Sequence, residues 1–349
     1  MSTRAENKQK PTPKKDDSIG LSQGQIVRKR FFGNTAAVVS MVVFFFVVIM
    51  AFTSIGYAGI PGWWKWNYVQ TLPLATPNGA PTWVLPFDFG DHPFGQDRVG
   101  RDLFAMTMRG TQLSLIIMFI IGILGGILGV IIGGVSGYFR GWVEAVLMRF
   151  TDTIIVIPLI ILAAVLGSVG NNLTGSGTFL RSIMGGSAGV ILLGVFVGLI
   201  IWTGLARLVR GEFLSLRERE FVDAARIAGA SDTRIIFKHI LPNAVGVIIV
   251  NTTLVMASAI LLESALSFLG LGVRAPDISL GSLISDNQQA FNTRPWLFWW
   301  PGLFIIMICL SINFIGDGLR DAFDPRQKKF NAKKAVHSGD ISDPNRPEA

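Results

Sequence analysis

Long apolar stretches constrain this chain more than any other feature of its sequence. Six of them approach the roughly 20 residues that an α-helix needs to cross a bilayer. They lie at 35–57, 113–138, 153–170, 187–206, 244–268 and 297–316, and the third is the shortest. Only 15% of the residues are charged, whereas soluble domains carry about a quarter. The pattern predicts an all-α membrane protein with six transmembrane helices.

The distribution of Lys and Arg around these stretches predicts the orientation of the chain. With the N-terminus in the cytoplasm, the cytoplasmic segments hold 24 of the 31 Lys and Arg residues, and the external segments hold seven. Lys and Arg accumulate on the cytoplasmic side of membrane proteins, so we expect both termini there. The net charge of +8 is spread beside apolar stretches, which favours lipid headgroups over nucleic acid as the partner.

The polar ends and loops divide the chain into segments. We expect a cytoplasmic tail at 1–33, a first helix at 34–57, an external subdomain at 58–112, a core of five helices at 113–318 and a second cytoplasmic tail at 319–349. Residues 1–25 and 327–349 are polar and lack apolar periodicity, which predicts disorder. The first apolar stretch is longer than the about 7–15 residues of a signal-peptide core, so we interpret it as an uncleaved helix.

Two further patterns concern packing and anchoring. Four glycines recur at every fourth position of the second stretch and share one helix face: Gly125, Gly129, Gly133 and Gly137. Small residues at this spacing let another helix approach closely, so they predict tight packing but no substrate site. The external segment carries Trp63, Trp64 and Trp66. Because Trp is enriched at membrane surfaces, anchoring is favoured there over ligand binding.

The connection between the fourth and fifth stretches, 207–242, is the most informative segment. A short run compatible with a helix precedes Gly229, and glycine can end a helix in the left-handed conformation. Ser231 can then cap another helix that has Asp232 in its first turn. The sequence therefore predicts two short cytoplasmic helices that meet at a Gly-Ala-Ser corner.

The spacing of this segment resembles the EAA loop of ABC importer permeases. Three residues separate Ala224-Ala225 from Gly229, and nine separate Gly229 from His239. The ending at 239–243, His-Ile-Leu-Pro-Asn, is similar to that of the dipeptide and oligopeptide branch. Asp223 stands where the family pattern has Glu, and His239 where it has Ile. The resemblance assigns these residues to coupling with an ATPase: Glu220, Phe221, Val222, Asp223, Ala224, Ala225, Arg226, Gly229, Ala230, Ser231, His239, Leu241 and Pro242. We expect Phe221 to be the apolar anchor of that contact, with Asp223 and Arg226 as its polar neighbours.

Three other stretches resemble the C-type subunit of peptide permeases. They are residues 92–102, similar to its external signature, 266–272, similar to the end of its fifth helix, and 313–326, similar to its C-terminal signature. Two departures, Gln112 in place of Arg and Leu280 in place of Trp, lie near the external face. They bear on the substrate or the receptor more than on the architecture.

The resemblance implies a type I ABC importer permease fold that moves di- or oligopeptides into the cytoplasm by alternating access. The implied partners are a homologous second permease, two cytoplasmic ATPase subunits or domains, an external solute-binding protein and the lipid bilayer of a prokaryotic inner membrane. ATP and Mg²⁺ belong on the ATPases, because this chain has no phosphate-binding G-x-x-x-x-G-K-[ST] motif and is expected to bind no cofactor. It is therefore not expected to be an enzyme itself. Nickel-chelate and glutathione permeases resemble peptide permeases closely and remain alternatives.

Glu263 is the one acidic residue within an apolar stretch that stands out as a candidate. A carboxyl group inside a membrane is costly, so we expect it to face the helix bundle, either on the pathway or as a structural hydrogen-bonding group. An ion-coupled secondary transporter, the less favoured alternative, would need several such groups. The three His residues are scattered, so no metal site is predicted. The single cysteine, Cys309, is interpreted as a packing residue.

Overall fold

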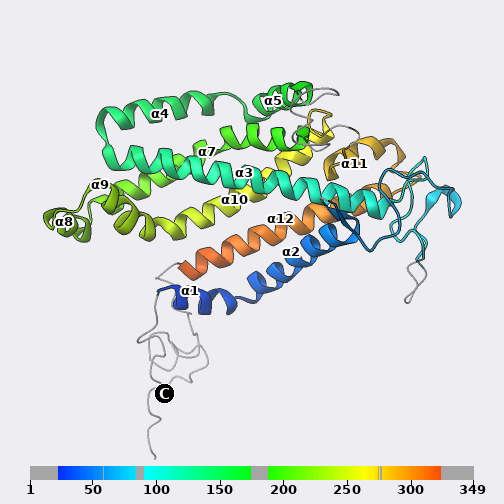
Figure 1. Cartoon of the computed structure of the whole chain (residues 1–349), viewed down its shortest axis with the longest axis horizontal. Helices are drawn as coiled ribbons and strands as arrows, with labels where there is room; N and C mark the ends of the chain where they lie inside the picture. Colours follow the sequence, from blue (N-terminus) through cyan, green and yellow to red (C-terminus); the bar gives the residue numbers. More distant parts are fainter. Residues whose placement is uncertain are drawn as a thin grey trace, which may run out of the picture.

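In the computed structural model the chain forms an elongated bundle of long helices that run side by side (Figure 1). The structure describes residues 23–57, 59–83, 90–173, 188–273, 275 and 277–323. Its long helices are α2 (Thr35–Ser54), α3 (Leu103–Phe139), α4 (Gly141–Val156), α5 (Leu159–Leu173), α7 (Ala188–Arg217), α10 (Leu241–Phe268) and α12 (Trp296–Phe323). The shorter elements are α1 (Gln23–Phe32), α8 (Glu220–Ile227), α9 (Asp232–Arg234), the π-helical η2 (Ile235–Ile240), α11 (Leu280–Asn287), the 3₁₀ turns η1 (Pro77–Gly79) and η3 (Gln288–Ala290), and an antiparallel pair of strands, β1 (Gly56–Tyr57) and β2 (Ile60–Pro61).

Five helices of the described residues are long and apolar enough to cross a membrane: α2, α3, α7, the continuous helix from Asp232 to Phe268, and α12. The helices α4 and α5 make a sixth span if they cross together, although the chain bends by 85° between them. The bend lies at Pro158, because proline disfavours helical backbone in the residue before it. Ile157 is accordingly extended, with ψ of 124°. The expected all-α membrane architecture is confirmed, with the third stretch as a broken helix.

Helix α1 corrects one expectation about the N-terminal tail. It begins at Gln23, so the disorder predicted for 1–25 is wrong at its last residues, because Val27 and Phe31 pack against α12 at Ala322. The rest of that segment, and the disorder predicted for 327–349, lie outside the described residues.

Two helices run well past the apolar stretches that predicted them. Helix α3 begins at Leu103 and not at 113, because the Asp102 carboxyl caps it by accepting from the Ala105 N–H at 2.8 Å. Helix α7 continues from the predicted end at 206 to Arg217, and Phe213 in this extension is 1% exposed. The prediction that a long loop begins at residue 207 is therefore wrong, since only residues 218–219 separate α7 from α8.

The glycine face of α3 packs against α7, as the spacing predicted. A Cβ atom at Gly133 would lie 2.4 Å from the backbone oxygen of Ala206, and one at Gly137 would lie 2.7 Å from that of Arg210. Contacts this short are possible only without side chains, which lets the two helix backbones approach each other. The expectation of tight packing is confirmed, and α3 and α7 form one closely packed pair.

The segment between α2 and α3 is organised around buried polar groups. The Asp102 carboxyl accepts hydrogen bonds from Trp64 Nε1 at 2.9 Å and pairs with His92 Nδ1 at 2.8 Å. The Trp66 ring stacks on His92, with 5.5 Å between the ring centroids. Trp64 and Trp66 are half-buried, and Trp66 Nε1 donates to the Asp91 carbonyl at 3.1 Å, so both indole groups hold this segment together. The membrane anchoring expected for the cluster stays a prediction.

Most polar side chains of residues 92–102 are used inside the same segment. The Gln96 amide donates to the carbonyls of Pro73 and Gly100, both at 3.1 Å. The Asp97 carboxylate accepts from Arg101 through both the backbone N–H and Nε, at 2.8 and 2.6 Å. Nearby, Lys65 hydrogen-bonds Asp91 and thereby holds the pKa of that carboxyl below its usual range. The motif at 92–102 thus builds the subdomain.

Candidate functional site

Helix α8 ends in a tight corner at one end of the bundle (Figure 1). Gly229 has φ of +80°, which is the left-handed conformation expected for it. The Ala230 N–H donates to the Ala225 carbonyl and the Gly229 N–H to the Arg226 carbonyl, both at 3.0 Å. This pair of hydrogen bonds is the Schellman motif that closes helix C-termini. The predicted corner is confirmed.

The chain after the corner forms one long helix. Ser231 caps it by accepting from the Arg234 N–H at 3.4 Å, and α9, η2 and α10 then run on continuously from Asp232 to Phe268. The prediction of a separate second short helix after the corner is therefore wrong. Pro242 does not end this helix, because the π-helical turn before it shifts the hydrogen bonds by one residue, as from the Leu241 N–H to the Ile236 carbonyl.

Tyr138 ties this corner to the end of α3. Its hydroxyl donates to Asp232 Oδ1 at 2.6 Å, and its backbone carbonyl accepts from the Arg217 guanidinium, which also lies over the Tyr138 ring at 5.4 Å. Tyr138 is 4% exposed. The corner is therefore bonded directly to the end of α3, whose glycine face packs against α7. Sequence reasoning did not identify Tyr138, although it directly follows the last glycine of that face.

The outer surface of the corner combines apolar and charged side chains. Phe221 is 40% exposed, as the anchor role requires, whereas the neighbouring Val222 is fully buried. Ile227 and Phe237, which sequence reasoning missed, are 89% and 65% exposed. Apolar groups this accessible on a polar surface are typical of contacts with another protein. A helical wheel would have found Ile227, because it lies on the same helix face as Asp223 and Glu220, four and seven positions earlier.

The other predicted coupling residues lie on the same segment. Asp223 and Arg226 pair with each other at 3.3 Å. Seven are exposed or sit at the turn itself: Glu220, Asp223, Ala224, Arg226, Gly229, Ser231 and Pro242. Four are half-buried: Ala225, Ala230, His239 and Leu241. All of the predicted coupling residues except Val222 are therefore accessible at this end of the bundle.

Glu263 lies in a buried hydroxyl cluster towards the opposite end, where α11 packs (Figure 1). It is 1% exposed, and its carboxyl accepts from Ser114 Oγ of α3 at 2.7 Å and from Ser267 Oγ of α10 at 2.8 Å. Ser267 Oγ in turn accepts from the Val273 N–H at 3.2 Å, in the turn after α10. Glu263 faces the bundle, as expected, and it joins α3, α10 and the chain leading to α11.

A second buried network lies next to this cluster. Arg109 of α3 pairs with Asp277 at 2.9 Å, and both side chains are almost buried. The fully buried amide of Gln112 donates to the carbonyls of Ala51 and Gly56, at 2.8 and 2.9 Å. Gln112 thus satisfies the C-terminal end of α2, and Leu280 is also fully buried. Both departures from the family pattern occupy packed positions inside this chain.

A groove runs between α7 and α10 from the corner end towards the middle of the bundle. Two cavities of about 540 and 300 Å³ form it, and they share Asn251 and Leu254. Polar groups in the wider one include Glu212, Arg320 and Asn251, and Ser258 lies in the narrower one. The groove thus places polar side chains from α7, α10 and α12 around one opening in an apolar bundle.

A bundle of apolar helices with a polar groove, and with an accessible helical corner tied to its closest-packed helix pair, defines a multi-pass membrane protein of the permease class. The chain belongs to the family of inner membrane components of binding-protein-dependent transport systems. The profile of this family matches residues 125–329, and the profile of the N-terminal transmembrane domain of oligopeptide transport permease C matches residues 22–81. The resemblance seen in the sequence is confirmed.

Two oligopeptide permeases agree with this assignment. The oligopeptide transport system permease protein OppC of Mycobacterium tuberculosis is 34% identical over 311 residues, which cover 88% of this chain and 97% of that protein. The OppC protein of Haemophilus influenzae is 36% identical over 310 residues, which cover 88% of this chain and 90% of the relative. An inward-facing crystal form of the MetNI methionine ABC transporter aligns with 63% of this chain and 96% of its own, with 20% identity and a TM-score of 0.48.

Proposed function

We propose that this chain is the C-type permease subunit of an ABC importer that brings di- or oligopeptides into the cytoplasm of a prokaryote. The corner at α8 and α9 carries the proposal, because it presents exposed apolar groups and is hydrogen-bonded to the end of α3. The peptide substrate is supported by the names of the relatives. In this proposal both termini and the corner face the cytoplasm, in keeping with the Lys and Arg distribution.

In the proposed mechanism the partner ATPases supply the energy by using ATP, and residues of this chain convert their movement into opening of the pathway. Two ATPases, which hold ATP and Mg²⁺, bind the corner of this chain and that of a second, homologous permease. When the ATPases close, the corner moves with them, and the hydrogen bond from Tyr138 to Asp232 carries the movement to α3. The packed pair of α3 and α7 then tilts as a unit, which opens the pathway alternately to an external binding protein and to the cytoplasm.

The groove between α7 and α10 supplies chemistry that suits a peptide. A peptide has one charged group of each sign at its termini and unpaired amide groups between them, and each needs a partner when water is removed. Glu212 and Arg320 place one charge of each sign on the wider cavity, and neither forms an ion pair with a described residue. Asn251 places an amide between α7 and α10. The second permease would close the open side of this groove.

Reconstitution of the complete complex in liposomes tests the function. We expect accumulation of labelled di- or tripeptides that requires ATP, the ATPases and the binding protein. Uptake without any ATPase would point to an ion-coupled transporter and contradict the proposal. Uptake of a nickel chelate or glutathione in preference to peptides would retain the permease role and overturn the peptide assignment.

Photo-crosslinking from the corner tests the orientation and the partner. Cys309 is the chain's single cysteine, so a Cys309→Ser background allows Phe221→Cys and Ile227→Cys to be labelled with a maleimide photo-crosslinker. We expect both to form adducts with the ATPase in the assembled complex, because both side chains are accessible. Ile60→Cys, at a position 73% exposed at the other end, is the matched control and should form none. An ATPase adduct from position 60 alone would reverse the proposed orientation.

Substitution of Gly229 tests coupling at the corner. A Cβ at Gly229 would meet no atom within 4 Å, so the left-handed backbone is the only obstacle to a side chain. Left-handed backbone costs about 1–2 kcal/mol for ordinary residues and is visited readily by Asn. We expect Gly229→Val to retain assembly but to lower peptide uptake per ATP hydrolysed several-fold, and Gly229→Asn to remain near wild type. Equal coupling ratios for Val, Asn and Gly would show that the corner's conformation does not transmit the movement.

A further inference from the structure

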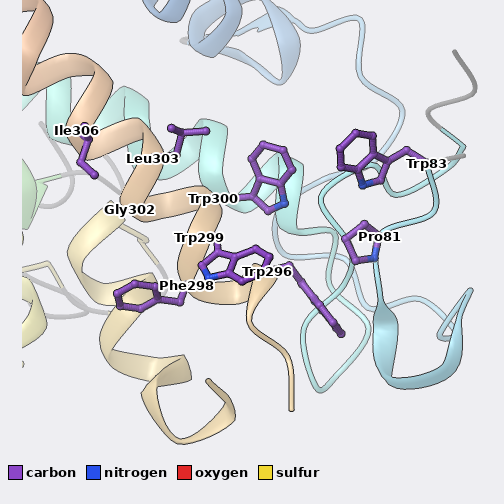
Figure 2. A pocket seen from close by; sticks show the side chains of 9 residues that line it. All are labelled: Pro81, Trp83, Trp296, Phe298, Trp299, Trp300, Gly302, Leu303 and Ile306. Atoms are coloured by element: carbon purple, nitrogen blue, oxygen red, sulfur yellow. The ribbon is translucent and has the colours of Figure 1, made fainter. Parts of the chain in front are cut away.

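A pocket of about 630 Å³ opens beside the first turns of α12 (Figure 2). Trp296, Trp299 and Trp300 of α12 line it together with Trp83 from the segment that precedes α3. None of its lining residues carries a charge. The volume lies within the roughly 300–1,000 Å³ of small-molecule sites. The pocket therefore suits an apolar ligand, and it lies at the end of the bundle away from the polar groove.

Part of the pocket wall is held rigidly by the segment before α3. The Trp300 ring stacks on Phe94, with 3.8 Å between centroids and 4° between planes. Trp296 Nε1 donates to the Gln96 carbonyl at 3.4 Å. Trp83 faces Trp300 across the pocket, with 6.4 Å between the ring centroids. A pocket held by such contacts is present before a ligand arrives, so binding does not require the wall to rearrange.

The pocket continues into an exposed apolar stripe on α12. The stripe consists of five side chains on one helix face, each between 43% and 61% exposed: Trp299, Leu303, Ile306, Leu310 and Phe314. The first three also line the pocket. Because α12 is long and apolar enough to cross the membrane, a stripe of this kind is the surface that meets acyl chains. The pocket is thus a hollow at one end of a lipid-facing stripe.

Three indole N–H groups at the pocket have no acceptor among the residues that the structure describes, so they can bind a polar headgroup. Trp83, Trp299 and Trp300 donate no hydrogen bond from Nε1 to any residue that the structure describes. Tryptophan side chains are enriched at the level of the lipid headgroups, where the ring stays in an apolar setting and the N–H reaches a polar acceptor. Ester and phosphate oxygens of a lipid are acceptors of this kind.

We propose that this pocket binds one phospholipid, with an acyl chain in the hollow beside Gly302 and Leu303 and headgroup oxygens at the indole N–H groups. The lipid would come from the outer leaflet if the corner faces the cytoplasm, as proposed above; the binding itself does not depend on the transported solute. Such a lipid joins α12 to the segment before α3, because the two sides of the pocket come from these elements.

Gly302 allows the pocket to be filled without disturbing the helix. A Cβ at this position would meet no atom within 4 Å, so Gly302→Leu places its side chain into the hollow. A Cβ at Gly211 of α7 also has no atom within 4 Å, and Gly211 does not line the pocket. Gly211→Leu is therefore the matched control. Native mass spectrometry of the purified complex, titrated with dioleoyl phosphatidylglycerol, should show one lipid site weakened about tenfold by Gly302→Leu, as expected when two methylene groups lose apolar contact. The control should bind as wild type does.

A fluorescence measurement makes the same proposal testable in the bilayer. In nanodiscs that contain phosphatidylcholine brominated near the ester end of one acyl chain, Trp299 should be quenched. The difference between wild type and Trp299→Phe isolates its signal. Unchanged lipid binding by Gly302→Leu would overturn the proposal. Trp299 emission that is not quenched in the assembled complex would overturn it too, and would show that a protein partner covers this face.

Discussion

Replacing Glu263 by Leu is expected to abolish ATP-dependent uptake and to lower the thermal stability of the complex, whereas replacing it by Gln should largely preserve both. The Leu variant removes the acceptors of two buried hydroxyl groups, Ser114 and Ser267. Each buried polar group left without a partner costs about 1–3 kcal/mol. The amide of Gln keeps one acceptor oxygen. It also adds N–H groups that can donate a hydrogen bond to a serine hydroxyl after that hydroxyl rotates. Uptake and the melting temperature of the purified complex measure the two effects.

The neighbouring Leu261 provides the control for this pair of variants. It is 50% exposed and lies on α10 two residues before Glu263, so Leu261→Ala should leave the melting temperature close to that of the wild type. If Glu263→Leu is as active and as stable as the wild type, the cluster does not hold the helices together. If Glu263→Gln is inactive although it is stable, the carboxyl takes part in proton movement, and a purely structural role is wrong.

Much of this architecture follows from local patterns that hold in any setting. The apolar stretches predicted the spans, the four-residue spacing of glycines predicted the face that meets α7, and Gly229 followed by Ser231 predicted the corner. The cost of burying a carboxyl in lipid predicted that Glu263 faces the bundle. In each case the physical constraint acts within a few residues along the chain, so it can be read without knowing the neighbours.

The features that sequence analysis missed depend on partners far away along the chain. Arg109 made the first ten residues of α3 look like an external loop, yet Asp277, 168 positions later, neutralises it inside the bundle. Tyr138 becomes a link only because Asp232 lies beside it, 94 positions away. The wider cavity of the groove exists because residues of α7, α10 and α12, far apart along the chain, line it together. Hydropathy averaged along the chain contains no information about these contacts between residues far apart in the sequence.

The close approach of α3 and α7 gives the other large effect that we expect: Gly133→Ala should destabilise the chain, although alanine is the better helix former by about 1 kcal/mol. The added methyl group would lie 2.4 Å from the backbone oxygen of Ala206. A backbone atom within a helix cannot rotate away, so α3 and α7 must separate along the glycine face. Overpacking of this kind costs typically about 1–3 kcal/mol.

Gly211→Ala adds the same methyl group to the same helix pair at a place where no atom lies within 4 Å. It should be neutral or stabilising by up to about 1 kcal/mol, because only the helix propensity changes. Thermal unfolding of the two purified variants can be followed by tryptophan fluorescence. The melting temperature of Gly133→Ala should fall below that of the wild type, whereas that of Gly211→Ala should rise or stay the same. Equal melting temperatures for both variants would mean that the backbones of α3 and α7 are not held at this distance. The link from the corner through α3 to α7 would then lose its rigid member, because a movement of α3 would be absorbed at the interface before it reached the groove.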